Sequence, residues 1–328
     1  MSAPHLSVML REILEALAPQ DGERFIDGTF GAGGYSRALL AAANTRVLGI
    51  DRDPTAIARG EEIAKEFDGR LTMARGNFGD LDQLAEAADF APVDGIALDL
   101  GVSSMQFDEG ERGFSFSHDG PLDMRMGGEA QGGRTAADIV NEDDVPELIR
   151  ILKTYGEERR ARTVAMAIEA ARKEMPITRT KQLAGIVERA IGSRGKPDRI
   201  HPATRTFQAL RIAVNDELGE LERGLLAAEQ VLAENGRLAV VSFHSLEDRI
   251  VKQFLTERSG SLPHGSRHLP EAPQGPAPTF ELLFRGTETP ADDEVAQNPR
   301  ARSARLRGAR RTAAPAWANL RKSGEGRS

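Results

Sequence analysis

Cysteine is absent from the 328-residue sequence. Its absence excludes disulfides, cysteine-ligated metal sites and thiolate nucleophiles, so no reaction at this chain proceeds through a covalent sulfur adduct. The sequence contains six histidines, and we predict no metal site. The chemistry must therefore depend on carboxylates, hydroxyls, amides and backbone groups, together with any cofactor that they bind.

Long apolar runs are also missing. No stretch approaches the roughly 18 consecutive apolar residues of a membrane-spanning helix. Residues 1–17 mix charged with apolar side chains and lack the apolar region of a signal peptide. We therefore expect a soluble, cytoplasmic protein with no membrane partner. The apolar fraction of 40% over 328 residues is sufficient for buried cores.

Net positive charge is missing over most of the chain. The net charge is −7, which by itself argues against a dedicated nucleic-acid-binding protein. However, residues 296–328 contain nine arginines and lysines and one glutamate, so the remaining 295 residues carry −15. We expect residues 296–328 to form a basic C-terminal tail, and this asymmetry points to a polyanionic partner.

Short apolar strands alternate with amphipathic helices in the first hundred residues. We predict strands at residues 24–27, 46–51, 71–74 and 95–100. The helices between them are expected at residues 36–43, from Pro54 onward and at 81–88. This order predicts a parallel sheet covered on both faces, and ligands of such sheets bind at the carboxyl ends of the strands.

An insertion interrupts this alternation, because the next predicted sheet strand is at residues 237–243. A single crossover unit needs only about 30 residues, and residues 145–191 have a helical pattern. We therefore predict an inserted helical domain at 110–202 within an α/β domain formed by 1–109 and 203–295. A long helix at 204–232 and a late strand at 280–284 complete the prediction.

A glycine-rich turn, DGTFGAGG at residues 27–34, follows the first predicted strand. It is neither a G-x-G-x-x-G fingerprint starting at Gly31, because Ser36 replaces the last glycine, nor a phosphate-binding loop ending in Gly-Lys-Ser/Thr. Asp51 ends the second strand, where a carboxylate can bind ribose hydroxyls. The pattern favours an adenosine-containing ligand and leaves open a nicotinamide cofactor, S-adenosylmethionine or a structural turn with a helix-capping aspartate.

Seven motifs along nearly the whole chain together resemble the bacterial 16S ribosomal RNA cytosine-N4 methyltransferase family. They are DGTFGAGG (27–34), GIDRDP (49–54), LDLGVSS (98–104), PLDMRM (121–126), HPATRTFQALR (201–211), VSFHSLEDR (241–249) and NPRARSARLR (298–307). The resemblance implies an α/β fold: a Rossmann-like sheet of the class I S-adenosylmethionine-dependent methyltransferases with an inserted all-helical domain.

The resemblance also implies S-adenosylmethionine as cofactor and assigns residues to it. Three residues are expected at its methionine end, one at the ribose, one by the adenine and two near the methyl donor. In that order they are Gly33, Gly34, Tyr35, Asp51, Phe78, Asp99 and Gln106. The family commonly has histidine at the position of Tyr35, proline at that of Ser7 and aspartate at that of Gly127.

The expected methyl acceptor is the N4 amine of cytosine, a poor nucleophile whose lone pair is delocalised into the ring. A carboxylate that accepts its hydrogen bonds would localise the lone pair. Asp99, at the end of the fourth strand, is our predicted catalytic residue. Methylation at carbon five normally needs a thiolate, so the absence of cysteine favours the amine.

The expected partner is 16S ribosomal RNA, within the small ribosomal subunit. The sequence predicts no particular oligomeric state. Base-stacking candidates are Phe107, Phe114 and Phe116, with apolar packing as the alternative. Basic residues of the inserted helices form a candidate RNA-facing surface, with solvated helix faces as the alternative: Arg159, Arg160, Arg162, Arg172 and Lys173. For residues 244–249 we favour a helix N-terminus capped by Ser245 over a substrate-facing segment.

Two other functions stay open at this point, a nicotinamide-dependent dehydrogenase and a non-catalytic RNA-binding assembly factor. The six arginines within residues 300–311 are candidate contacts to RNA phosphates. If all six contacted phosphates, the log–log salt slope of binding would be about −4 to −5. Deleting residues 299–328 is then expected to weaken RNA binding and to flatten this slope.

Overall fold

The computed structural model describes residues 7–103, 106–107, 109–192, 201–261 and 276–317. The chain divides into two compact units, the first formed by Met1–Gly101 with Leu218–Ser328 and the second by Val102–Glu217. The second unit is therefore longer at both ends than the expected insertion at 110–202. Gln106 hydrogen-bonds Met126, and Phe207 belongs to the core of the second unit, so both flanks pack with it.

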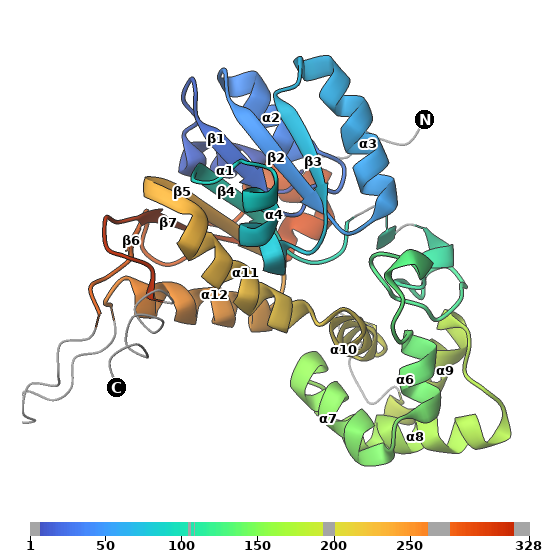
Figure 1. Ribbon diagram of the computed structural model, residues 1–328. Helices are drawn as coiled ribbons and strands as arrows, with labels where there is room; N and C mark the ends of the chain where they lie inside the picture. Colours follow the sequence, from blue (N-terminus) through green and yellow to red (C-terminus); the bar gives the residue numbers. More distant parts are fainter. Residues whose placement is uncertain (1–6, 104–105, 108, 193–200, 262–275, 318–328) are drawn as a thin grey trace, which may run out of the picture. The chain divides into compact units, whose positions relative to one another are not determined.

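A seven-stranded sheet forms the centre of the first unit in the described part of the chain, with the order β3-β2-β1-β4-β5-β7-β6 (Figure 1). Its strands are β1 (Arg24–Asp27), β2 (Arg46–Asp51), β3 (Leu71–Arg75), β4 (Val93–Asp99), β5 (Leu232–Ser242), β6 (Phe280–Leu282) and β7 (Arg305–Arg311). β1 to β5 pair in parallel, and β7 runs antiparallel to both of its neighbours. The predicted α/β fold class is confirmed.

Helices cover both faces of this sheet. They are α1 (Leu10–Leu17), α2 (Gly34–Ala42), α3 (Pro54–Ala64), α4 (Leu81–Ala87), α11 (Glu217–Val231), α12 (Ser245–Arg258) and the short α13 (Asp292–Gln297). One core joins α1, α2 and α3 to the sheet, with Ile13, Leu39 and Ile63 buried in it. The other joins α4, α11 and α12 to the opposite face (Figure 1). This burial of alternate strand residues on two faces is typical of parallel sheets.

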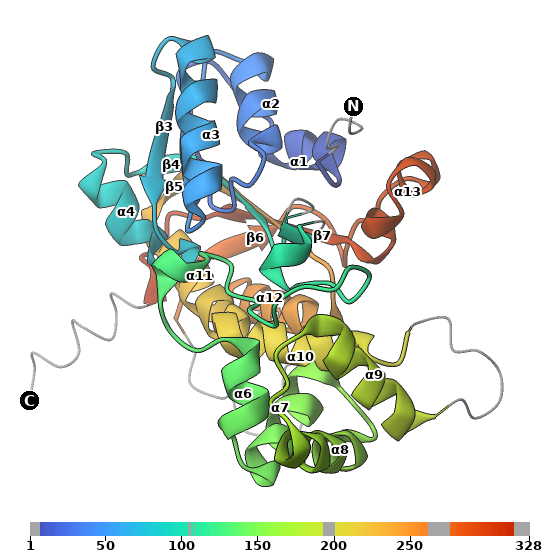
Figure 2. The same cartoon turned by 90° about the vertical axis from the view of Figure 1, so that its right-hand side faces the viewer.

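The second unit is helical. It contains α6 (Ala136–Glu142), α7 (Val145–Gly156), α8 (Ala161–Glu174), α9 (Thr180–Ile191) and α10 (Thr204–Asn215), gathered around one apolar core (Figure 2). The predicted single helix at 204–232 is wrong, because Asp216 adopts a left-handed conformation with φ 50° and separates α10 from α11. No glycine or proline marks this break in the sequence.

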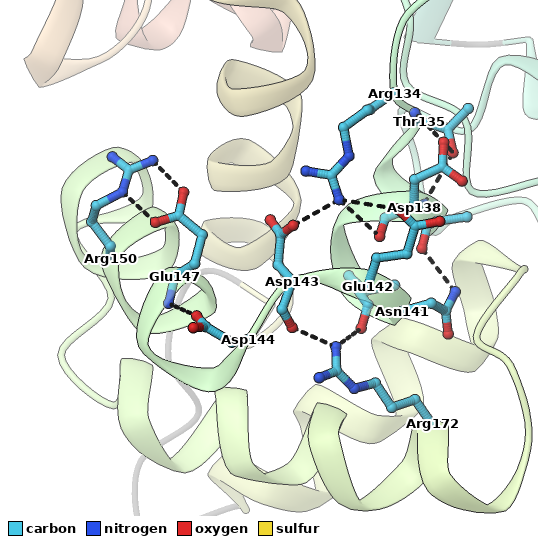
Figure 3. A network of polar contacts seen from close by, with 12 residues as sticks. Arg134, Thr135, Asp138, Asn141, Glu142, Asp143, Asp144, Glu147, Arg150 and Arg172 are labelled. Carbon is cyan, nitrogen blue, oxygen red and sulfur yellow. Dashed lines mark hydrogen bonds and ion pairs between the residues drawn. The ribbon is translucent and has the colours of Figure 1, made fainter.

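A polar network surrounds α6 in the second unit (Figure 3). Thr135 and Asp138 form a reciprocal capping box at the beginning of α6, which satisfies backbone donors that a helix start leaves unpaired. Arg172 of α8 donates to the carbonyl oxygens of Val140 and Asp143 at 3.0 and 2.7 Å. These bonds satisfy carbonyls at the end of α6 and join it to α8.

The expected basic tail is a sheet strand over residues 305–311. β7 lies between β5 and β6, with Leu306 and Ala309 fully buried. Arg307 forms a two-bonded ion pair with Asp248, and Arg310 pairs with Glu281. The charge run concealed this strand because arginines occupy several of its alternate positions. The last three basic positions, Arg321, Lys322 and Arg327, lie in residues 318–328, outside the described residues.

In the described residues, no helix combines the length and the hydrophobicity that crossing a membrane requires.

Candidate functional site

Three aspartates end neighbouring parallel strands of the first unit. Asp27 is the last residue of β1, Asp51 of β2 and Asp99 of β4. The register pairs Asp27 with Gly49 and with Ala97, so each of the other carboxylates lies two residues beyond the position paired with Asp27. The strand ends thus bring all three carboxylates to one edge of the sheet, where ligands of such folds bind.

Asp27 is completely buried at the start of the glycine-rich turn. Its Oδ2 accepts hydrogen bonds from the amide and the hydroxyl of Ser36, at 3.1 and 2.7 Å. Its Oδ1 has no hydrogen-bond partner among the described residues. Burial disfavours the charged form and raises the pKa of Asp27 to about 6, against the lowering effect of the Ser36 hydrogen bonds.

Asp27→Asn is expected to make protein stability less sensitive to pH. Between pH 3.8 and about 6, the native Asp27 holds a proton more tightly than the unfolded chain does, so the wild-type protein loses stability as the pH rises. Asparagine cannot ionise, and its oxygen can still accept from Ser36. The variant should therefore be the more stable protein above pH 6, by up to about 3 kcal/mol. Urea unfolding of both proteins from pH 4.5 to 8 measures this, and a pH-independent difference would contradict it.

Asp51 connects the glycine-rich turn to β2. Its Oδ2 accepts from the Gly31 amide and its Oδ1 from the Asp53 amide, both at 2.8 Å. Gly31 has φ 53°, a conformation that glycine adopts without a steric penalty. Burial raises the pKa of Asp51, and these backbone hydrogen bonds lower it. Each carboxylate oxygen can accept a second hydrogen bond, so capacity for ribose hydroxyls is present.

The Oδ1 atom of Asp99 is enclosed and has no hydrogen-bond partner among the described residues. The Asp99 amide donates to the Thr29 hydroxyl at 2.7 Å, which attaches the end of β4 to the glycine-rich turn. Burial raises the pKa of Asp99 well above its usual value, and the charges of Asp27 and Glu247 raise it further. The site therefore favours a cationic or hydrogen-bond-donating ligand at Asp99.

The glycines of the turn allow close approach. A Cβ on Gly28 would lie 2.5 Å from Leu98 Cδ2 and 3.4 Å from the Cβ of Phe78. Phe78 is half-buried, and its ring lies against Gly224 of α11. Gly33, with φ 80°, is the residue immediately before α2, so the first amides of this helix, which have no carbonyl partner within the helix, lie beside the turn. Phe78 and the turn thus lie next to each other in the first unit.

Gln106 belongs to the second unit. Its Nε2 donates to the Met126 carbonyl oxygen at 3.1 Å, and its Oε1 accepts from the Ser103 amide at 3.3 Å. These bonds give the side chain a structural part within that unit. Its assignment to the cofactor stays a prediction.

The three phenylalanines expected near the base differ in exposure. Phe114 is buried in the core of the second unit, and Phe116 packs edge-on against Phe207 with ring centroids 5.0 Å apart. Phe107 is exposed. Apolar packing therefore accounts for Phe114 and Phe116, and Phe107 is the candidate of the three that remains accessible for stacking.

The basic residues of the inserted helices are partly occupied inside the second unit. Arg160 donates to the Ile191 carbonyl oxygen, Lys173 pairs with Glu169 at 3.0 Å, and Arg172 holds α6. Arg159 and Arg162 are exposed. Most of these basic residues therefore lie on solvated helix faces or pair with groups inside the second unit.

Residues 244–249 form a helix N-terminus, as favoured from the sequence, but the cap is a different residue. His244, and not Ser245, precedes α12 and forms a reciprocal capping box with Glu247. Glu247 also raises the pKa of Asp99. This proximity had no sequence signal, since 148 positions separate the two residues.

The arrangement fits S-adenosylmethionine chemically. The cofactor carries a sulfonium and an ammonium group. Two carboxylates with enclosed, unpartnered oxygens, the buried Asp27 and the half-buried Asp99, lie at one edge of the sheet. Asp51 provides acceptors for ribose, and Phe78 an aromatic surface beside the turn. Opposite charges at short range in a buried site attract strongly, so the cationic cofactor would offset the cost of burying these carboxylates.

Comparisons with known proteins cover almost the whole chain. Residues 2–312 match the MraW methylase family. The chain is 59% identical over 314 residues to the ribosomal RNA small subunit methyltransferase H of Xanthobacter autotrophicus, covering 96% of this chain and 89% of that protein. It is 61% identical over 312 residues to the protein of the same name from Rhodospirillum centenum, covering 95% and 93%.

Among solved structures, an rRNA methylase from Streptococcus thermophilus aligns with 94% of this chain and 99% of its own, at 9% identity and a TM-score of 0.42.

Proposed function

Because the chain belongs to the MraW methylase family, we propose that it transfers a methyl group from S-adenosylmethionine to the N4 amine of a cytidine in the decoding region of 16S ribosomal RNA. Methyl transfer to ribosomal RNA is supported by relatives that are 55–61% identical and named ribosomal RNA small subunit methyltransferase H. The choice of an amine is supported by the buried, unpartnered oxygen of Asp99 and by the absence of cysteine.

Seven residues of the first unit would bind the cofactor in this proposal. Gly33, Gly34 and Tyr35 would line its methionine end, Asp51 would accept from the ribose hydroxyls and Phe78 would pack by the adenine. The amides at the start of α2 favour a carboxylate near them, because a helix N-terminus carries partial positive charge. Asp99 and Asp27 would face the cationic part.

Asp99 would orient and activate the substrate amine. S-adenosylmethionine supplies a methyl group bonded to a positively charged sulfur. The Asp99 carboxylate would accept a hydrogen bond from the N4 amine, which localises the nitrogen lone pair toward that methyl group. As the new N–C bond forms and the C–S bond breaks, the amine would lose a proton, and Asp99 would accept it. Its raised pKa suits a proton acceptor better than an ordinary surface carboxylate would.

Mass spectrometry of ribosomal RNA nucleosides tests the proposal. Cells that lack this protein should lose N4-methylated cytidine from small-subunit RNA, and the purified protein should restore it with methyl-labelled S-adenosylmethionine. A dehydrogenase would instead bind NAD(P) and not S-adenosylhomocysteine in calorimetry. A non-catalytic assembly factor would bind RNA but transfer no label. An unchanged nucleoside profile in the deleted cells would contradict the proposal.

A further inference from the structure

The segment Ser7–Met9 lies directly against the start of α2. A Cβ placed on Gly34 would lie only 1.7 Å from the Ser7 hydroxyl oxygen, so Ser7 occupies the space that a larger residue at position 34 would need. Val8 and Met9 are buried, with 7% and 0% of their surface exposed. This segment, called the N-terminal strap below, therefore packs on residues that are proposed to hold the methionine end of the cofactor.

Two side chains from distant parts of the sequence hold the backbone of the strap. The Tyr35 hydroxyl donates to the Val8 carbonyl oxygen, and the Glu294 carboxylate accepts from the Met9 amide at 2.7 Å. Met9 has φ 53° and directly precedes α1. An amide bonded to a carboxylate forms a stronger hydrogen bond than one bonded to a neutral oxygen. Glu294 therefore fixes the position where the strap turns into α1.

Glu294 also contributes charge at the site. It lies on the short helix α13 and is half-buried. Burial is the main cause of the raised pKa of Asp99, and the charge of Glu294 adds to it. Tyr35 likewise has a raised pKa, first through burial and then through the charges of Asp99 and other carboxylates. Glu294, Tyr35 and Asp99 therefore form one electrostatic neighbourhood around the strap.

We propose that Glu294 is a positioning residue of the cofactor site, which acts by holding the N-terminal strap against Gly34 and Tyr35. This inference depends on the proposed function, because it assigns the strap to the S-adenosylmethionine site. Glu294 touches no reacting atom. It fixes Met9, the strap fixes the beginning of α2, and the methionine end of the site is thereby preformed before the cofactor binds. Preformed sites bind more tightly because less ordering is required on binding.

Glu294→Ala and Glu294→Gln separate this role from a general structural one. The alanine variant should raise the Kd for S-adenosylhomocysteine and the KM for S-adenosylmethionine about tenfold, with kcat changed less than twofold. Glutamine keeps the acceptor oxygen without its charge, so it should restore both constants to within about threefold of wild type. Amide exchange at Met9 should be faster in the alanine variant only. Asp292→Ala, an exposed acid of the same helix, is the matched control and should change none of these.

Tyr35→Phe tests the other contact of the strap. It removes the bond to Val8 and should raise the same Kd about fivefold, and it keeps the inference testable if Glu294→Ala fails to fold. Faster Met9 exchange with an unchanged Kd in Glu294→Ala would overturn the inference. Equal losses in the glutamine and alanine variants would also overturn it, because charge alone would then explain the effect. A wild-type protein that binds no S-adenosylhomocysteine would contradict the proposed function instead.

Discussion

Replacing Asp99 with alanine is expected to lower the single-turnover rate of methyl transfer by about 10²–10⁴-fold, the range that loss of a positioned acid or base usually produces. The variant loses the carboxylate that we propose as the acceptor for the N4 amine. The cofactor contacts that we propose for Gly33, Gly34 and Asp51 would stay in place. The Kd for S-adenosylhomocysteine should therefore change by less than about tenfold, as measured by calorimetry.

Asp99→Asn sharpens this test. Asparagine preserves the size of the side chain, but its amide nitrogen is a donor and would oppose the amine hydrogens. It should thus be nearly as inactive as alanine. Glu61→Ala, which removes an exposed carboxylate on α3, is the matched control and should retain full activity. Wild-type rates in both Asp99 variants would show that another group orients the amine.

Deleting residues 299–328 is expected to abolish folding of the first unit, and not merely to weaken RNA binding. The deletion removes β7, which pairs with β5 over six positions and with β6 over three. It also removes the buried Arg311, which donates to the carbonyl oxygens of Glu229 and Thr279 at 3.0 Å. The total stability of a domain is only about 5–15 kcal/mol. We expect the free energy lost with a strand from inside the sheet to exceed this stability.

The comparison for this truncation is deletion of residues 318–328, which begins after Trp317 and leaves β7 complete. Circular dichroism and urea unfolding should show a folded protein for the shorter deletion alone. A cooperative, native-like unfolding transition in the longer deletion would contradict the structural role of β7.

The contribution of the arginines of residues 300–311 to RNA binding must be tested with point substitutions, because the deletion is expected to unfold the first unit. Arg302 and Arg305 are exposed, and their joint replacement by glutamine should flatten the log–log salt slope of RNA binding by about 1.4 if both contact single-stranded phosphates.

Local patterns in the sequence were sufficient for the parallel part of the sheet. The strands β1 and β2 begin and end at the predicted residues, because apolar runs bounded by glycine, aspartate and proline define them without reference to distant partners. β7 escaped prediction for the opposite reason. Its arginines find partners on α12 and β6, such as Asp248 and Glu281, and only the folded structure supplies these partners.

The residues of the candidate site also differ in whether the sequence alone could identify them. Asp51 and Asp99 could be singled out because they end predicted strands beside a glycine-rich turn. Glu294 could not, since 285 positions separate it from Met9 and a single acid in a short helix has no distinguishing pattern. Likewise, Asp27 lies within the motif DGTFGAGG, but its burial and its unpartnered oxygen arise only when the strands pack.

The placement of β7 has a consequence for how the protein is made on the ribosome. Strands β1 to β4 emerge early, but β4 cannot pair with β5 until the second unit has been synthesised. In turn, β5 cannot pair with β7 until residues 305–311 have been added. At about 5–20 residues per second, the interval between Asp99 and Arg311 lasts about 10–40 s. During that interval the nascent sheet presents an open edge, while the continuous second unit is free to fold first.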